Sequence, residues 1–218
     1  MNRAPAASSL LFVIAAGLAI LLSGPLLLFN PWFVSFEQGR FGVAPSLESD
    51  QAGVDRVTAP MLADLVRNGD FGESLNGRTP ILDSAERSHM RDVGGLVRAL
   101  LAIEVVALVV LAIAGRRLRN ARARRGRLLL TAAGGVGAGA ILLAAFFAIS
   151  FEAAFAAFHA LFFAAGTWQF GPDSNLIRLF PEPFWFEVSL LAGASIVLSA
   201  LIAALLGRRD LRLAEAAA

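Results

Sequence analysis

The sequence predicts an all-α integral membrane protein with four transmembrane helices and two extracytoplasmic segments, the first a small, partly ordered domain. Three observations lead to this expectation. The 218-residue chain is 57% hydrophobic and only 17% charged, which is too apolar for an ordinary soluble domain. Four apolar runs are long enough to cross a bilayer core of about 30 Å. The arginines gather beside some of these runs and are scarce beside the others.

The four spans are placed at about residues 10–29, 96–114, 128–149 and 188–206, within a single membrane domain of residues 1–218. The first run differs from a cleaved signal peptide, because it is long, contains Pro25 and lacks a clean cleavage site before the polar loop. Arg98 and Glu104 interrupt the second run, and they are expected to face a partner helix. Glycines in the third run are expected to let a neighbouring helix approach closely; they are Gly134, Gly135, Gly137 and Gly139.

The arginines indicate the orientation. Residues 116–127 hold seven arginines in twelve residues, whereas residues 151–183 hold only Arg178. The positive-inside rule therefore predicts that both termini and the 116–127 link are cytoplasmic. Membrane lipid is the expected partner of this arginine cluster, and no nucleic-acid partner is expected because the chain has no nucleic-acid motif.

Two segments then face outward. Residues 31–94 form an extracytoplasmic loop, in which residues 31–92 contain ten acidic residues and six arginines, a net charge of −4. A short helix is expected over 50–68 and a small hairpin in the turn-rich stretch 68–80. Asp83 and Glu86 have the spacing of a capping box, so one helix is expected to run from Ser84 to Arg117. Residues 151–187 are expected to be re-entrant or interfacial.

Cysteine, lysine and tyrosine are absent, and His89 and His159 are the only histidines. Thiolate chemistry is therefore excluded, and the two imidazoles are the groups that titrate near neutral pH. Glu86 and Asp92 each lie three residues from His89, which puts them on one helix face where a carboxylate could orient the ring. An exposed surface histidine is the alternative.

His159 lies in a helical stripe with Glu152, Phe155, Phe162 and Phe163. Such a greasy stripe with a polar centre could hold acyl chains beside a neutral imidazole that accepts a proton. A core histidine bonded to a backbone carbonyl is the alternative. Arg91 and Arg178 could contact an anionic or ester-bearing headgroup, or else snorkel to the interface or pair with a nearby glutamate.

Three strings together resemble a known family: "NPWFVSFEQGRFGV", "ERSHMRDVGGL" and "FEAAFAAFHALFF" with the later "LIRLFPEPFWF". They are similar to the lipoprotein intramolecular transacylases, small four-span bacterial membrane proteins. The resemblance implies that the sn-2 acyl chain of an S-diacylglyceryl cysteine moves to the α-amino group of the same cysteine. The product is an N-acyl, S-monoacylglyceryl (lyso) lipoprotein, made at the outer face of the bacterial cell membrane.

The resemblance implies diacylated bacterial lipoproteins as partners and no cofactor or metal. It suggests His159 as general base, His89 as an orienting or relaying group beside Glu86 or Asp92, and Arg91 or Arg178 as donor to the ester oxygen. The two imidazoles are then expected to meet beside a site for fatty chains. The candidate catalytic residues are His159 and His89, and the candidate substrate-binding residues are Arg91, Arg178, Glu86, Asp92, Glu152, Phe155, Phe162 and Trp168.

Two other classes remain open from the residues alone. A serine- or metal-dependent membrane lipid hydrolase could use the histidines with Glu86, Asp92 or Glu152, although no zinc-binding spacing supports it. A non-enzymatic accessory or transport protein could use Arg98 and Glu104, although no inverted repeat supports transport.

Overall fold

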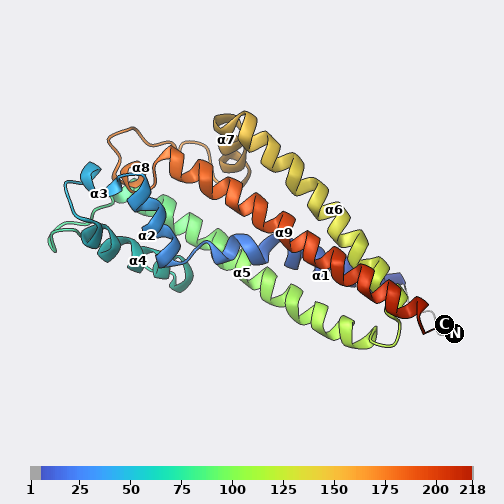
Figure 1. The fold of residues 1–218 in the computed structure, drawn as a ribbon. Helices are drawn as coiled ribbons and strands as arrows, with labels where there is room; N and C mark the ends of the chain where they lie inside the picture. The colour runs from blue at the N-terminus through green and yellow to red at the C-terminus, as the bar shows by residue number, and fades with distance from the viewer. Residues whose placement is uncertain (1–5, 218) are drawn as a thin grey trace. The chain divides into compact units, whose positions relative to one another are not determined.

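The computed structural model describes residues 6–217, and all regular secondary structure in that range is helical (Figure 1). Nine helices follow one another in the described residues: α1 (Ala6–Leu27), α2 (Pro31–Arg40), α3 (Val43–Ser46), α4 (Gln51–Arg67), α5 (Ser84–Arg117), α6 (Arg122–Ile149), α7 (Phe151–Phe162), α8 (Asn175–Leu179) and α9 (Glu182–Glu215).

Four of these helices are long and apolar enough to cross a membrane: Ser8–Leu27 within α1, and all of α5, α6 and α9. The predicted fold class is confirmed. Helices α5 and α9 each have 34 residues and so extend about 50 Å, well beyond a hydrocarbon core of about 30 Å. The expected continuous helix from Ser84 to Arg117 is the observed α5.

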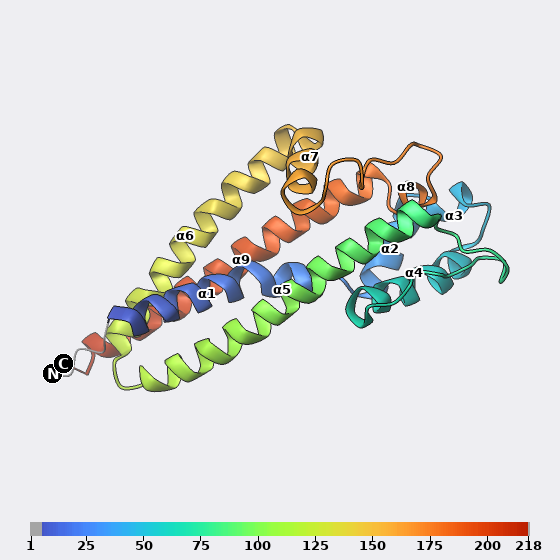
Figure 2. The same cartoon turned by 180° about the vertical axis from the view of Figure 1, so that it is seen from behind.

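Packing divides the chain into two compact units. Unit 1 consists of Met1–Leu26, Leu100–Ala145 and Leu191–Ala218, and unit 2 of Leu27–Ala99 and Phe146–Leu190. Within unit 1, α1 lies beside the parts of α5, α6 and α9 that belong to it, in both ribbon views (Figures 1 and 2). Its core is built mainly of small side chains, and its buried members are Phe12, Ala16, Ile20, Leu118, Ala132, Ala133, Ala140, Ile196 and Ala200.

Close helix contact in unit 1 occurs at two glycines that face each other. A Cβ atom on Gly126 of α6 would lie 2.6 Å from the carbonyl oxygen of Gly207 on α9, and one on Gly207 would lie 2.8 Å from that of Gly126. Of the four glycines expected to have this role, only Gly137 packs tightly, with Ala200 3.2 Å from its Cβ position. The other three were wrongly assigned, because no described atom beyond their own helix lies within 4 Å of their Cβ positions.

Polar side chains also link the helices of unit 1. Ser23 of α1 donates a hydrogen bond of 2.5 Å to Oε1 of Glu104 on α5, and Glu104 is buried. Glu104 therefore faces a partner helix as expected. Arg125 of α6 forms a bidentate ion pair with Asp210 of α9, with two N–O distances of 2.6 Å.

Unit 2 gathers the short helices. Asn30 caps α2 by accepting a bond from the Phe33 amide at 2.9 Å, and Pro31 at the first helical position needs no amide partner. Asp50 caps α4 through the Gly53 amide at 2.7 Å. Helices α2, α3 and α4 pack on one another and α8 packs on α3. The buried members include Val34, Val43, Val54, Val57, Met61, Leu65 and Leu179.

The stretch 69–83 contains no strand, so the predicted hairpin is wrong. The side-chain oxygen of Asn76 accepts bonds from the amides of Arg78 and Thr79, which forms a local turn in place of a ladder. One backbone bond of 2.7 Å, from the Ile81 amide to the Glu73 carbonyl, closes the loop. Arg98, which was expected at a helix interface, donates to the Leu65 carbonyl in the last turn of α4 at 3.0 Å.

The glycine contact gives a direct test of packing. Gly126→Ala is expected to destabilise the protein by about 1–3 kcal/mol, because the new methyl group meets backbone that cannot rotate away. Gly135→Ala on the same helix meets nothing and is expected to be neutral or stabilising, since alanine favours helix. Thermal unfolding of the purified protein in detergent measures both, and equal midpoints for the two variants would contradict the contact.

Candidate active site

The two histidines of the chain lie side by side in unit 2. His89 is in the second turn of α5 and His159 is in the last turns of α7, and their ring centroids are 6.0 Å apart with the planes 30° from parallel. Both are buried, with exposed fractions of 6% and 9%. Residues 70 positions apart in the sequence therefore form one pair of imidazoles.

Aromatic rings surround this pair. The His159 ring lies 4.1 Å from the ring of Phe155 and 4.7 Å from that of Trp168, as measured between centroids. Phe163 contacts both imidazoles, at 4.9 Å from His89 and 5.5 Å from His159. Among the predicted substrate-binding residues, Phe155 and Trp168 thus contact the pair, whereas Phe162 lies beside Phe158, with ring centroids 5.0 Å apart and planes tilted by 52°, and is 46% exposed.

The tautomer of His159 follows from its backbone contact. Nδ1 lies 2.8 Å from the Phe155 carbonyl oxygen, which can only accept, so Nδ1 carries the proton. Nε2 then holds a lone pair in the neutral ring. Burial lowers the pKa of His159 from its usual value, and the hydrogen bond to the carbonyl offsets part of that effect. This is the backbone bond that the alternative to a catalytic histidine expected, and it leaves Nε2 as the unprotonated ring nitrogen.

His89 has a different environment. Its Nδ1 is buried and has no hydrogen-bond partner among residues 6–217. Asp92, which was expected to orient it, has an exposed side chain, and no hydrogen bond joins the two. A buried polar atom without a partner is unusual, and it is available to a bound ligand or water.

Glu86 was also expected beside His89, but its carboxylate is used elsewhere. Oε2 accepts a 2.7 Å bond from the Asp83 amide, which with the 2.8 Å return bond from the Glu86 amide to Asp83 forms the predicted capping box. Oε1 accepts from the Ser174 hydroxyl at 2.5 Å and from the Leu176 amide at 3.0 Å. The expectation of a direct Glu86–His89 contact is therefore wrong, because the carboxylate accepts from three donors and none of them is the imidazole.

These bonds join the start of α5 to the segment that contains α8. Asn175 adds a bond of 2.8 Å from its side-chain amide to the Ile81 carbonyl. Ser174 also caps α8 by accepting from the Ile177 amide at 3.3 Å. Neither Ser174 nor Asn175 was singled out from the sequence. The serine before the apolar stretch "NLIRL" is the capping signal that could have located α8.

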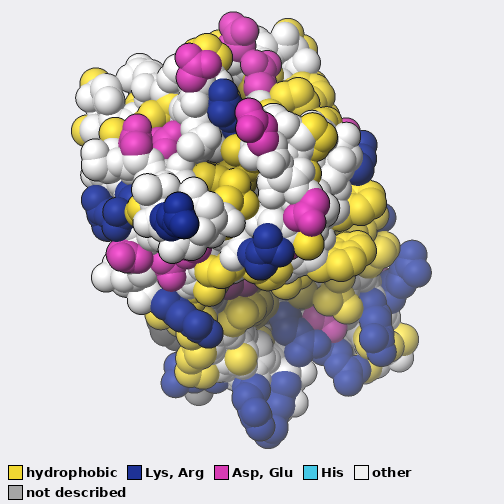
Figure 3. Space-filling model, turned by 90° about the vertical axis from the view of Figure 1, so that its left-hand side faces the viewer, with side chains coloured by type: hydrophobic (Ala, Val, Ile, Leu, Met, Phe, Trp, Pro, Cys, Tyr) yellow, Lys and Arg dark blue, Asp and Glu magenta, His cyan; other side chains and the backbone are white. Residues whose placement is uncertain are grey.

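The predicted charged ligands lie on the surface of unit 2. The side chains of Arg91, Glu152 and Arg178 are exposed and form no hydrogen bond or ion pair with another residue that the structure describes. Arg178 does not pair with Glu187, which instead binds Arg40 in a bidentate contact of 2.5 and 3.1 Å. On the face of the molecule drawn in Figure 3, acidic and arginine side chains are interspersed and no histidine is visible, in keeping with the burial of the imidazoles.

Arg40 also contacts Glu37 of its own helix at 3.0 Å. Glu37 is only 2% exposed, and burial raises the pKa of its carboxyl above the usual value. The neighbouring Gln38 donates to the Leu179 carbonyl at 2.9 Å. The string "FEQGR" thus supplies structural links from α2 to α8 and α9.

Within residues 6–217, no three histidine or acidic side chains come together as a metal site.

The family model of the lipoprotein intramolecular transacylase Lit matches residues 8–185, a range that includes both histidines. The chain belongs to this family. It is therefore an acyltransferase of the membrane, and the hydrolase and the non-enzymatic alternatives give way to a transacylase. No match was found among curated protein sequences.

Solved structures show the same fold. An in meso structure of the membrane integral lipoprotein intramolecular transacylase Lit from Bacillus cereus has a TM-score of 0.84 and 19% sequence identity, with 96% of each chain covered. A variant of that protein, in which arginine replaces one histidine, has a TM-score of 0.79 at 18% identity, with 97% of this chain and 94% of that chain covered. A further variant, with alanine for that histidine, has a TM-score of 0.78 at 18% identity and coverages of 96% and 94%.

The role of Glu86 can be tested apart from catalysis. Glu86→Ala is expected to destabilise unit 2 by about 3 kcal/mol, because buried donors lose their acceptor. Hydrogen exchange at residues 81–86 and 174–180 should then accelerate, while exchange in residues 128–140 stays unchanged. Asp92→Ala on the same helix removes an exposed carboxylate and is the matched control. Protection of residues 174–180 that survives in Glu86→Ala would show that other contacts hold this segment.

Proposed function

We propose that the protein transfers the sn-2 acyl chain of an S-diacylglyceryl cysteine to the α-amino group of the same cysteine, at the N-terminus of a bacterial lipoprotein. The product is an N-acyl, S-monoacylglyceryl lipoprotein. The observation that carries this proposal is the buried imidazole pair, in which Nδ1 of His159 is bonded to a carbonyl and Nε2 is left as a base.

This reaction needs no nucleophile from the protein. The substrate's own amine attacks its own ester carbonyl, so a new C–N bond forms while the bond from the carbonyl carbon to the glyceryl oxygen breaks. The sequence fits this requirement because it lacks cysteine and lysine. Holding amine and ester in contact within one molecule can lower the barrier by several kcal/mol, about 7–11 in the best cases.

One proton must move from the attacking amine to the departing glyceryl oxygen. Nε2 of His159 takes the proton that leaves the attacking amine, and the imidazolium then protonates the departing glyceryl oxygen, so no net proton is consumed. His89, with its unpaired Nδ1, orients or relays this proton. Two rings 6.0 Å apart repel each other when both are charged, which favours a single shared proton over two.

The surrounding residues suit an acylated ligand. Phe155, Trp168 and Phe163 give an apolar wall beside the imidazoles, and the exposed Phe162 extends this apolar surface. Arg91 or Arg178 supplies a donor to the ester oxygen as charge develops on it, a role worth about 3 kcal/mol when the donor is well placed. Glu152 lies in the first turn of α7 and is a candidate partner for the substrate's ammonium group.

The arginine distribution supports an orientation in the bacterial cell membrane with both termini in the cytoplasm. The imidazole pair then faces the extracytoplasmic side, where lipoproteins carry their lipid. Diacylated lipoproteins are the proposed partners, and the reaction requires no cofactor.

A synthetic diacylated lipopeptide tests the proposal. Intramolecular transfer yields a product of unchanged mass whose α-amine no longer reacts with an amine-specific reagent, whereas a hydrolase releases a fatty acid. His159→Asn is expected to lower kcat/KM by about 10²–10⁴-fold, as for loss of a general base. Arg78→Gln, in the exposed loop of unit 2, is the control. Full activity of His159→Asn would remove His159 from the mechanism, and release of free fatty acid by the unaltered protein would overturn the reaction itself.

The lowered pKa of His159 predicts the pH profile. The base must be neutral, and because burial holds the pKa of His159 below 6.5, the imidazole itself stays neutral at pH 6.5 and its contribution to activity is lost only as the pH drops through that lowered pKa. Measurement of kcat/KM from pH 4.5 to 9 should show this acid limb, distinct from titration of the substrate's α-amine near about 7.7–8. An acid limb centred above pH 7 that is separate from the limb of the substrate's α-amine, and that disappears in His159→Asn, would contradict the buried neutral imidazole.

A further inference from the structure

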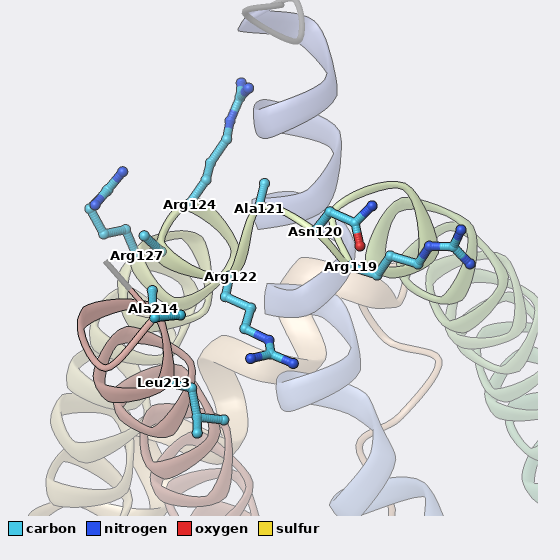
Figure 4. Close-up of a pocket in the computed structure, with 10 residues that line it drawn as sticks. Arg119, Asn120, Ala121, Arg122, Arg124, Arg127, Leu213 and Ala214 are labelled. Atoms are coloured by element: carbon cyan, nitrogen blue, oxygen red, sulfur yellow. The ribbon is translucent and has the colours of Figure 1, made fainter. Parts of the chain in front are cut away.

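A second site lies in unit 1, where α5 ends, α6 begins and α9 ends. Side chains there line a cavity of about 530 Å³, shown in Figure 4. Arginines from the α5–α6 link and the start of α6 form one part of the lining, and Leu213 and Ala214 of α9 form another. The arginines are Arg119, Arg122, Arg124 and Arg127.

Little of the charge of these arginines is balanced locally, although Arg122 interacts electrostatically with Asp210. No acidic residue lines the cavity. The buried Asp210 is engaged by Arg125 in two bonds of 2.6 Å. The side chains of Arg119, Arg122 and Arg127 form no hydrogen bond or ion pair with another residue in the described range. Arg124 donates to the Ser9 hydroxyl.

The backbone adds donors beside the same cavity. Helix α6 begins at Arg122, and its first backbone bond runs from the Arg125 amide to the Ala121 carbonyl at 3.0 Å. The amides before Arg125 have no partner within the helix, and Ala121 has no side chain that could cap them. These amides add hydrogen-bond donors to the arginine side chains.

Membrane topology alone does not require this arrangement. Arginines spread over a convex surface satisfy the positive-inside rule, as exposed Arg116, Arg117 and Arg208 do nearby. Guanidinium groups match phosphate oxygens in bidentate geometry, and this chain uses arginine for all its 19 basic residues.

We propose that this arginine-lined cavity binds a phosphate group. Two sources could supply it, the headgroup of an anionic phospholipid or inorganic phosphate from solution. The lining favours the lipid, because Leu213 and Ala214 offer apolar contact to a glycerol backbone and the cavity lies at the ends of membrane-spanning helices. The bound headgroup joins the α5–α6 link to the end of α9. This site is separate in its residues from the imidazole pair, and it does not depend on the proposed acyl transfer.

The experiment compares two triple variants of the full-length protein. Arg119→Gln, Arg122→Gln and Arg127→Gln together remove three charges from the cavity, while Arg116→Gln, Arg117→Gln and Arg208→Gln remove three charges beside it. Purified proteins in a nonionic detergent are titrated with dioleoyl phosphatidylglycerol, dioleoyl phosphatidylcholine and inorganic phosphate, and binding is followed by native mass spectrometry and thermal shift.

The cavity variant is expected to bind phosphatidylglycerol at least ~10-fold more weakly, and the control variant less than ~2-fold. Phosphatidylglycerol that inorganic phosphate does not displace identifies the lipid as the ligand. If inorganic phosphate binds, loses affinity in the cavity variant but not in the control variant, and phosphatidylglycerol binds no better, the phosphate site is supported and its ligand is the free ion. Equal losses in both variants, or no loss in either, would overturn the proposal. If the triple variant does not fold, single Arg122→Gln against Arg116→Gln makes the same comparison, with ~3-fold weaker binding expected for Arg122→Gln alone.

Discussion

The geometry of the imidazole pair depends on one buried carboxylate. Glu86 is 2% exposed and accepts from the Asp83 and Leu176 amides and the Ser174 hydroxyl. A carboxylate this deep would cost several kcal/mol without donors, and here the start of α5 adds the favourable end of a helix dipole. Because Glu86 lies one turn before His89, the bonds that satisfy its charge also fix where α5 begins and hence where His89 lies. Its other partners belong to residues 174–176, so the same group joins the two outward segments.

Neither imidazole is hydrogen-bonded to a carboxylate among the described residues, although Asp92 acts on His89 electrostatically. In many hydrolytic sites an acidic residue orients the histidine and stabilises its charged form. Here the Phe155 carbonyl fixes the tautomer of His159, and aromatic rings rather than charges make up the surroundings. A carbonyl oxygen orients the ring and so sets the direction of Nε2. Unlike a carboxylate, it carries no full negative charge that would stabilise the protonated imidazolium. In the proposed mechanism, His159 is thereby a neutral base that takes a proton and gives it back within one turnover.

The sequence predicted most of the fold and the meeting of the two histidines, but not the contacts that position them. The long apolar runs gave the four spans, and the Asp83–Glu86 spacing gave the start of α5, because these depend on local composition and capping. The partner of Glu86 could not be predicted, since it lies 88 residues away and depends on how the second outward segment folds back. The four glycines of α6 were over-interpreted for a related reason. Glycine permits a close approach, but the face that a neighbour covers is decided by the whole bundle, and Gly126 lies on that face while Gly135 does not.

The aromatic surroundings also bear on the choice between transfer and hydrolysis. A histidine that can deprotonate an amine can equally deprotonate water, so the base alone does not make the enzyme a transacylase. Water attack on the ester would release the acyl chain. The rings of Phe155, Phe163 and Trp168 occupy positions around the imidazoles where water would otherwise approach, while the substrate's amine is carried to the base by its own ester. Excluding water from the site does not remove the nucleophile, because the attacking amine is part of the substrate that is already bound. The preference for transfer over hydrolysis in this proposal therefore arises from the apolar lining as much as from the two histidines.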